Sequence, residues 1–164
     1  MTLLAIDPGR SKLLPSIGWA TFREDGSEYR RGELTWDLLC RALWVRGFDD
    51  EDDYGHAQLW FSPSVYGGYR IHEIAIENFI NNPTSRGGQT NGTSEVIGAV
   101  EILAAQAGVP FTRQPNTILP IAKLQAGYTQ KLKHLPHQDA AYLHGYYYLV
   151  GKGVLVSKGL ESTL

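Results

Sequence analysis

The sequence predicts a mixed α/β domain, in which helices flank a five-stranded sheet. The first three strands of the sheet are expected to be antiparallel and the later strands parallel. Short β-prone runs fill the first third of the chain, and helical patterns dominate from residue 94 onward. In that later part helices alternate with strands, which is typical of parallel pairing because parallel neighbours need a long crossover. The length of 164 residues suits one domain spanning 1–164.

The first third predicts an antiparallel meander of three strands. The first strand, Leu3–Asp7, is an apolar run that ends on a carboxylate, and Pro8-Gly9 follow it as a tight turn. Ile17–Phe22 is expected to be the second strand and Tyr29–Leu34 the third. Asp7 would therefore be held rigidly at the rim of the sheet.

The segment after the third strand has the weakest pattern. Its apolar spacing predicts a helix over Trp36–Val45, with Cys40 as a small core residue. The acidic run Asp49–Asp53 is interpreted as a solvated loop; a metal site is the alternative, although the run lacks the glycine-punctuated spacing of a calcium loop. Residues 54–72 fit either a helix or an extended arm.

A second β-prone run, Ile74–Phe79, repeats the pattern of the first, because it too brings a carboxylate, Glu77, to the end of a strand. The glycine-rich residues 81–93 predict a loop that either contacts phosphates through its arginine or simply covers the surface. Ser94–Ala107 has the strongest helical pattern, with Thr93 or Ser94 as its N-cap and Gly108 at its C-terminal end.

The last third predicts one more strand and two more helices. Val109–Gln114 is expected to be a short strand, and Thr117–Ala126 a helix that Gly127 ends. A final helix would begin near Pro136, which suits a first helical turn, and run to about Val150. Asp139 then lies near the N-terminus of this helix, where an acid also stabilises the helix dipole.

Composition and charge narrow the function. The hydrophobic and charged fractions are those of a soluble globular protein, and no apolar run approaches the ~20 residues that span a bilayer, so a cytoplasmic location and no membrane partner are expected. The net charge is −2, but it is unevenly spread. Residues 1–72 carry eight Lys/Arg against eleven Asp/Glu, whereas residues 81–133 carry five against two. A basic half of this kind is compatible with nucleic acid binding.

Three carboxylates, Asp7, Glu77 and Asp139, are the candidate site. If the strands that carry Asp7 and Glu77 are neighbours, the two-residue period of a strand lets both side chains face the same side and converge. The alternative is that each acid only meets solvent where its strand ends, and that Asp139 only compensates the helix dipole.

In their order and spacing, these stretches resemble the RuvC-like Holliday-junction resolvases of the ribonuclease H-like superfamily. The resemblance is carried by Ala5-Ile6-Asp7-Pro8-Gly9 continuing to Ile17-Gly18-Trp19-Ala20, by Ala75-Ile76-Glu77-Asn78-Phe79, by residues 95–110 with their Gly-Val-Pro ending, and by Asp139-Ala140-Ala141. It covers most of the chain, with 35–72 poorly matched, and implies a ribonuclease H-like fold forming a single nuclease domain.

The resemblance implies a metal-dependent endonuclease that resolves four-way DNA junctions by paired nicking. Asp7, Glu77 and Asp139 would hold two Mg²⁺ or Mn²⁺ ions, one activating a water for attack on the scissile phosphate and the other stabilising the leaving 3′ oxygen. Three carboxylates packed together would repel one another without a cation.

The fourth ligand departs from the family pattern. Relatives carry an acid or a histidine three residues before the last Asp, and that position here is Pro136, which cannot coordinate a metal. His137 is the nearest substitute, provided that it precedes the regular helix, because residues two apart on a helix point about 200° apart. His134 and Gln138 are less favoured, and His144, five residues after Asp139, is expected to point elsewhere.

The resemblance also implies contacts with DNA. Phe79 or Ile80 would probe the junction, unless they belong to the core. A four-way junction is nearly two-fold symmetric, so a homodimer is the matching assembly, with the helix from Ser94 as a candidate dimer face. The candidate phosphate contacts are Arg86, Arg113, Lys123, Lys131 and Lys133.

Three other functions stay open at this point. A ribonuclease H-like nuclease could act on forks, flaps or RNA–DNA hybrids instead of junctions. A catalytically silent DNA-binding relative would account for Pro136. Asp7-Pro8-Gly9 is also similar to the phosphate loops of sugar-kinase and actin-like proteins, but those need two such domains and this chain has room for one.

Overall fold

The structure is a computed structural model that describes residues 2–9, 15–39, 71–78 and 92–159. Its sheet has five strands in the order β3-β2-β1-β4-β5, in which β2 is antiparallel to β1 and β3, and β4 is parallel to β1 and β5. This confirms the predicted mixed sheet. The elements are β1 (Thr2–Asp7), β2 (Ile17–Phe22), β3 (Glu28–Leu34), β4 (Ile71–Asn78), α2 (Gly92–Ala107), β5 (Phe111–Pro115), the 3₁₀ turn η1 (Asn116–Ile118), α3 (Leu119–Ala126) and α4 (His137–Gly151).

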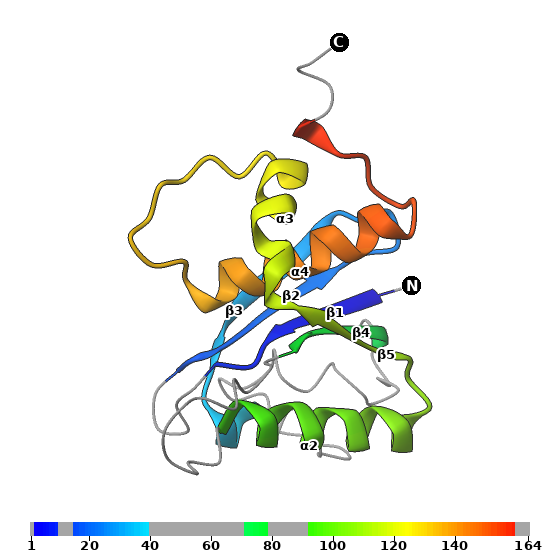
Figure 1. Ribbon diagram of the computed structural model, residues 1–164. Helices are drawn as coiled ribbons and strands as arrows, with labels where there is room; N and C mark the ends of the chain where they lie inside the picture. Colours follow the sequence, from blue (N-terminus) through cyan, green and yellow to red (C-terminus); the bar gives the residue numbers. More distant parts are fainter. Residues whose placement is uncertain (1, 10–14, 40–70, 79–91, 160–164) are drawn as a thin grey trace.

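Helices cover both faces of the sheet. Figure 1 shows α2 against one face and α4 across the other, with α3 packed beside α4. The α2 face is built from large aliphatic residues, among them Ile6 and Ile76 of the sheet and Val100 of the helix. The α4 face is built on small residues, Ala5 and Ala75 among them. Because the small residues leave room, α4 can lie close to the strands that carry the candidate carboxylates.

Two glycines make this close approach possible. A Cβ on Gly145 of α4 would lie 2.1 Å from the ring of Phe22, so only glycine lets this turn of the helix rest on β2. A Cβ on Gly18 of β2 would lie 1.9 Å from the carbonyl oxygen of His137. The first turn of α4 therefore sits directly on the backbone of β2, beside the end of β1.

The element boundaries differ from the predicted ones where local chemistry intervenes. Residues 54–72 were predicted to be either a helix or an extended arm. β4 begins at Ile71, so the last two residues of that segment belong to a strand. The predicted helix over 117–126 is split into η1 and α3 at Leu119, next to Pro120, whose missing N–H suits a first turn. Pro136 is the N-cap of α4 and not its first residue.

The predicted cap of α2 has a different role. Thr93 lies inside the helix, and its Oγ1 donates a hydrogen bond to the carbonyl oxygen of Gly9 at 2.9 Å. This bond ties the N-terminal end of α2 to the turn that follows Asp7. The predicted stop signals are confirmed: Gly108 and Gly127 take left-handed backbone angles where α2 and α3 end.

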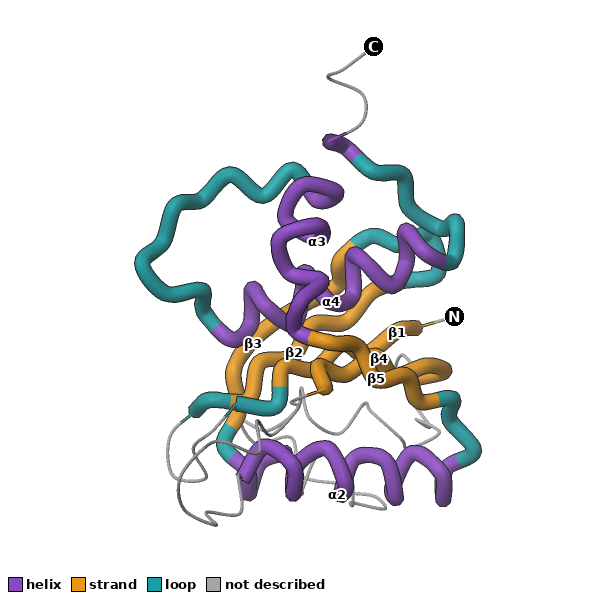
Figure 2. Tube along the Cα trace, in the orientation of Figure 1, coloured by secondary structure: helices purple, strands orange, loops and turns teal. Residues whose placement is uncertain are grey.

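Other predictions fall on residues outside the described ranges. Residues 36–39 are helical, as expected, while the rest of the helix predicted to Val45 lies outside, together with Cys40 and the acidic run 49–53. The glycine-rich segment 81–91 also lies outside. In the described part of the chain, no helix is both long enough and apolar enough to cross a bilayer. The trace in Figure 2 shows the connection after α3 swinging out to one side before it leads into α4.

Candidate active site

Asp7, Glu77 and Gln114 lie side by side on three neighbouring strands, β1, β4 and β5. The register pairs Ile6 with Ile76, which makes the next residues of the two parallel strands neighbours, and pairs Glu77 directly with Gln114. Because parallel strands end at the same edge, these side chains form a polar row across the sheet, under α4. The neighbouring position on β2 is Gly18, the register partner of Asp7. The predicted adjacency of the two strand carboxylates is therefore present in the structure.

Asp7 is nearly buried at one end of the polar row. Its Oδ2 lies 2.8 Å from Nδ1 of His137, and its Oδ1 accepts a longer bond of 3.4 Å from the backbone N–H of Gly9. Burial raises the pKa of the Asp7 carboxyl; the bond to His137 opposes this rise, and the negative charge of Glu77 adds to it. The protein therefore fixes the orientation of the Asp7 carboxylate, but burial and the neighbouring charge of Glu77 disfavour its ionised form.

His137 reaches Asp7 because it is the first residue of α4 and packs directly against the backbone of β2. This close packing is possible because Gly18 has no side chain. The hydrogen bond to Asp7 raises the pKa of the His137 imidazole, although partial burial works against the charged form. The structure thus joins His137 and Asp7 as a hydrogen-bonded pair. His137 is the first residue of the regular helix and does not precede it, so the condition for sharing a site with Asp139 is not met, and metal binding by His137 stays a prediction.

Glu77 has a histidine partner that the sequence argument set aside. Nε2 of His144 lies 3.3 Å from Oε2 of Glu77, and Nδ1 of the same ring lies 3.0 Å from Oε1 of Gln114. The spacing of five residues from Asp139 predicts that His144 points elsewhere, and the structure contradicts this. The relevant spacing is from His137: seven residues are nearly two full helical turns, so both histidines lie on the face of α4 that meets the polar row. The seven-residue spacing in the sequence could therefore have identified His144 as a residue of the site.

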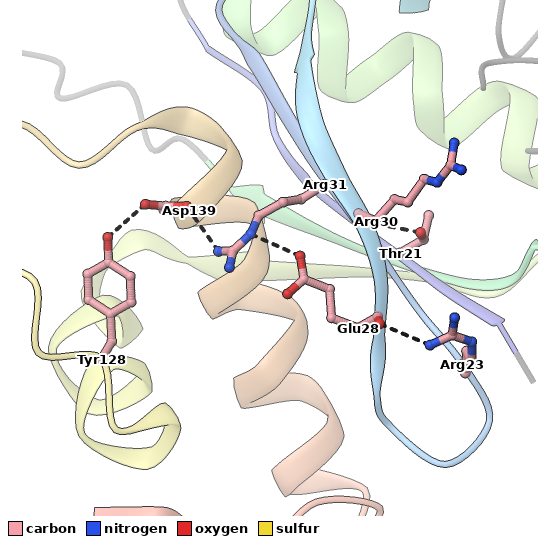
Figure 3. A network of polar contacts seen from close by, with 7 residues as sticks. All are labelled: Thr21, Arg23, Glu28, Arg30, Arg31, Tyr128 and Asp139. Carbon is pink, nitrogen blue, oxygen red and sulfur yellow. Dashed lines mark hydrogen bonds and ion pairs between the residues drawn. The ribbon is translucent and has the colours of Figure 1, made fainter. Parts of the chain in front are cut away.

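Asp139 lies on a different side of α4 and does not join the polar row. Its Oδ1 is 2.9 Å from Nη1 of Arg31 on β3, and its Oδ2 accepts a 2.7 Å bond from the hydroxyl of Tyr128. Arg31 also pairs with Glu28 at 2.9 Å and lies over the ring of Tyr142. Figure 3 shows Asp139 between Arg31 and Tyr128. The expected convergence of three carboxylates is absent from this arrangement, and a metal-binding role for Asp139 stays a prediction.

The phosphate contacts predicted from charge lie in different places. Arg113 is on β5 and forms an ion pair with Glu101 of α2, on the face of the sheet opposite α4. Lys123 is on α3, and the exposed Lys131 and Lys133 lie in the connection that leads into His137. Phe79, Ile80 and Arg86 lie outside the described residues.

The chemistry of the polar row fits a divalent cation. Asp7 and Glu77 are adjacent carboxylates, and hard cations prefer such oxygen ligands. Burial is the main cause of the raised pKa of Asp7, and the negative charge of Glu77 adds to the rise. Nε2 of His144 is buried and makes no hydrogen bond in the described structure. No three His, Cys, Asp or Glu side chains of the described ranges converge on one point, so solvent or substrate oxygens would complete the coordination of an ion held here.

The strand order, the mixed pairing and the helices on both faces define a RuvC-like, ribonuclease H-like fold. Two solved structures share it: the Thermus thermophilus RuvC structure, at 15% identity and a TM-score of 0.51, covering 95% of this chain and 99% of that one; and T. thermophilus RuvC in complex with Holliday junction substrate, at 13% identity and a TM-score of 0.54, covering 95% and 98%. No family model and no curated protein matches the sequence. At these identities the likeness establishes the fold.

Proposed function

We propose that this protein is a metal-dependent endonuclease that resolves four-way DNA junctions by paired nicking. The observation that carries the proposal is the pair Asp7 and Glu77, neighbouring carboxylates at the ends of adjacent parallel strands. They occur in a fold shared with a resolvase whose structure holds a junction substrate. Carboxylates in this arrangement bind the cations that phosphodiester hydrolysis uses.

The residues of the site have separable tasks in this proposal. Asp7 and Glu77 hold the cations, and His137 keeps the Asp7 carboxylate in one orientation through its hydrogen bond. Two Mg²⁺ or Mn²⁺ ions, when bound, supply an activated water and stabilise the leaving 3′ oxygen. Asp139 contributes a third carboxylate only after its oxygens leave Arg31 and Tyr128.

In this proposal, binding of the DNA depends on basic residues outside the polar row. Lys131 and Lys133 are exposed in the connection that leads into α4, and in this proposal they bind phosphates of the DNA. Each phosphate that a lysine neutralises makes binding fall more steeply with salt. A homodimer would present two such sites to a nearly two-fold symmetric junction, which is the assembly that paired nicking requires.

Cleavage of matched DNA substrates tests the proposal. Four-way junctions, forks, flaps, linear duplexes and RNA–DNA hybrids of the same sequence would be incubated with the protein in Mg²⁺ or Mn²⁺, and both strands mapped. Symmetric nicks confined to the junction support a resolvase. Cleavage of forks or hybrids at equal rates would instead indicate a different ribonuclease H-like nuclease, and tight junction binding without cleavage a catalytically silent relative.

A further inference from the structure

The imidazole of His144 is fully buried, yet only one of its two nitrogens makes a hydrogen bond. Nδ1 lies 3.0 Å from Oε1 of Gln114, whereas Nε2 has no hydrogen-bond partner in the described structure and faces Oε2 of Glu77 at 3.3 Å. A buried polar atom without a partner is costly, and native proteins rarely keep one without a purpose. The explanation must account for both the free nitrogen and its carboxylate neighbour.

The hydrogen bond from Gln114 decides which nitrogen is free to bind. An amide oxygen can only accept, so Nδ1 is the nitrogen that carries the proton. When the ring carries this single proton, Nε2 has a lone pair and lies 3.3 Å from Oε2 of Glu77. This is the arrangement of a metal-ligating histidine, whose second nitrogen almost always donates to an oxygen that sets the tautomer and the orientation of the ring.

The separation of the two atoms also suits a shared cation. Two ligand atoms bound at about 2.1 Å to one ion, at angles between about 90° and 109°, lie about 3.0–3.4 Å apart. Oε2 of Glu77 and Nε2 of His144 are separated by 3.3 Å. A nitrogen lone pair and a carboxylate oxygen this close repel each other, and a cation bound to both atoms would reverse that repulsion.

We propose that His144 is a nitrogen ligand, together with Glu77, of the cation held at the polar row, with Gln114 as the residue that positions its ring. This inference rests on the metal-dependent function proposed above, but it concerns a residue that the family pattern of ligands does not include. A nitrogen ligand favours Mn²⁺, or the later transition ions, over Mg²⁺, whose preferred ligands are oxygens. The site would thus be a mixed oxygen and nitrogen site.

The test measures Mn²⁺ binding to the full chain in the absence of DNA. Pulsed electron paramagnetic resonance of the Mn²⁺ complex detects a directly bound imidazole nitrogen through its hyperfine coupling. The wild-type protein and the His137→Phe variant should show the coupling, and His144→Phe should lose it and bind Mn²⁺ at least about tenfold more weakly. Tyr146→Phe is the matched control. Tyr146 is also on α4, and its hydroxyl donates a partly buried hydrogen bond to the carbonyl oxygen of Val156, which is not part of the row.

Each outcome has one meaning. A coupling that survives in His144→Phe, or that disappears only in His137→Phe, overturns the inference. Mn²⁺ binding without any nitrogen coupling also overturns it, while leaving the proposed nuclease intact. A wild-type protein that binds no Mn²⁺ defeats both proposals. Should His144→Phe fail to fold, ¹¹³Cd²⁺ with ¹⁵N-labelled histidine in the wild-type protein decides the matter: a cadmium–nitrogen coupling assigned to Nε2 of His144 supports the inference, and a coupling assigned only to another histidine overturns it.

Discussion

Nδ1 of His137 lies 2.8 Å from Oδ2 of Asp7, although 130 residues separate them in the chain. The contact exists because α4 begins on the bare backbone of Gly18, the residue that pairs with Asp7 across β1 and β2. One glycine therefore determines whether the first turn of the last helix can reach the carboxylate at the end of the first strand. Several measurable effects depend on this arrangement.

Removal of either strand carboxylate should stop cleavage. Asp7→Asn or Glu77→Gln keeps the size of the side chain but removes the charge that holds the cation, so junction cleavage should fall by at least about a hundredfold. Junction binding in Ca²⁺, measured by gel shift, should stay within about threefold of the wild type, because DNA affinity comes mainly from basic residues. An active Asp7→Asn or Glu77→Gln variant would remove that residue from the site.

Gly18→Ala should loosen the first turn of α4. The added Cβ would lie 1.9 Å from the carbonyl oxygen of His137, so the backbone must shift, at a cost of about 1–3 kcal/mol in the free energy of unfolding. The matched control is Gly98→Ala in α2, where a Cβ meets nothing within 4 Å and helix propensity should give a gain of about 0.5–1 kcal/mol. Urea unfolding measures both changes. Equal stabilities of the two variants would contradict the close packing of α4 on β2.

Arg31→Ala should free Asp139. The guanidinium pairs with Asp139 and Glu28 and lies on the ring of Tyr142, so its loss should lower the free energy of unfolding by about 1 kcal/mol. If Asp139 acts as the third carboxylate of the proposed site, the same variant should also bind Mn²⁺ more tightly in calorimetric titration. Arg30→Ala removes the same charge from the next position of β3 and should leave Mn²⁺ affinity unchanged. Unaltered affinity in Arg31→Ala would identify Asp139 as an anchor of α4.

Stability of the metal-free protein should decline with rising pH through His137. The bond to Asp7 raises the pKa of this imidazole above its ordinary value of 6.5, so its stabilising charge is fully present below pH 6.5 and is lost as the pH rises through the raised value. His137 is partly exposed, which limits the loss to less than about 1 kcal/mol. Unfolding in EDTA between about pH 6 and pH 9 measures it. His137→Ala should flatten the profile, whereas His134→Ala should retain it.

The basic connection before α4 should contribute to DNA affinity. Lys131→Gln with Lys133→Gln removes two exposed charges, so junction binding should weaken, and the slope of log affinity against log salt should become shallower by about two. The double variant Lys152→Gln with Lys158→Gln removes equal charge near the C-terminal end of α4 and beyond, and should have a smaller effect. Identical salt slopes for the two double variants would place the DNA elsewhere.

Local patterns were sufficient to predict the strands and most of the helices. Ile17–Phe22 was predicted to the residue, because alternation, β-branched residues and flanking turns act within a few positions. The left-handed glycines after α2 and α3 were also predictable, since a helix end needs one residue that tolerates a positive φ. The change from antiparallel to parallel pairing was predictable from the helix that separates β4 from β5, whereas the order of the strands in the sheet was not predicted.

The sequence by itself determined that Asp7 and Glu77 lie near the ends of two strands, because the pattern of a strand is local. The tertiary structure decided that these two strands are parallel neighbours. Only the tertiary structure decided what α4 brings to them. The rotation and depth of that helix depend on two contacts, Gly18 of β2 against His137 and Gly145 of α4 against Phe22. They turn His137 and His144 toward the row and Asp139 toward Arg31. A helix fixes the angles between its own side chains, but only packing chooses which of its faces meets the sheet.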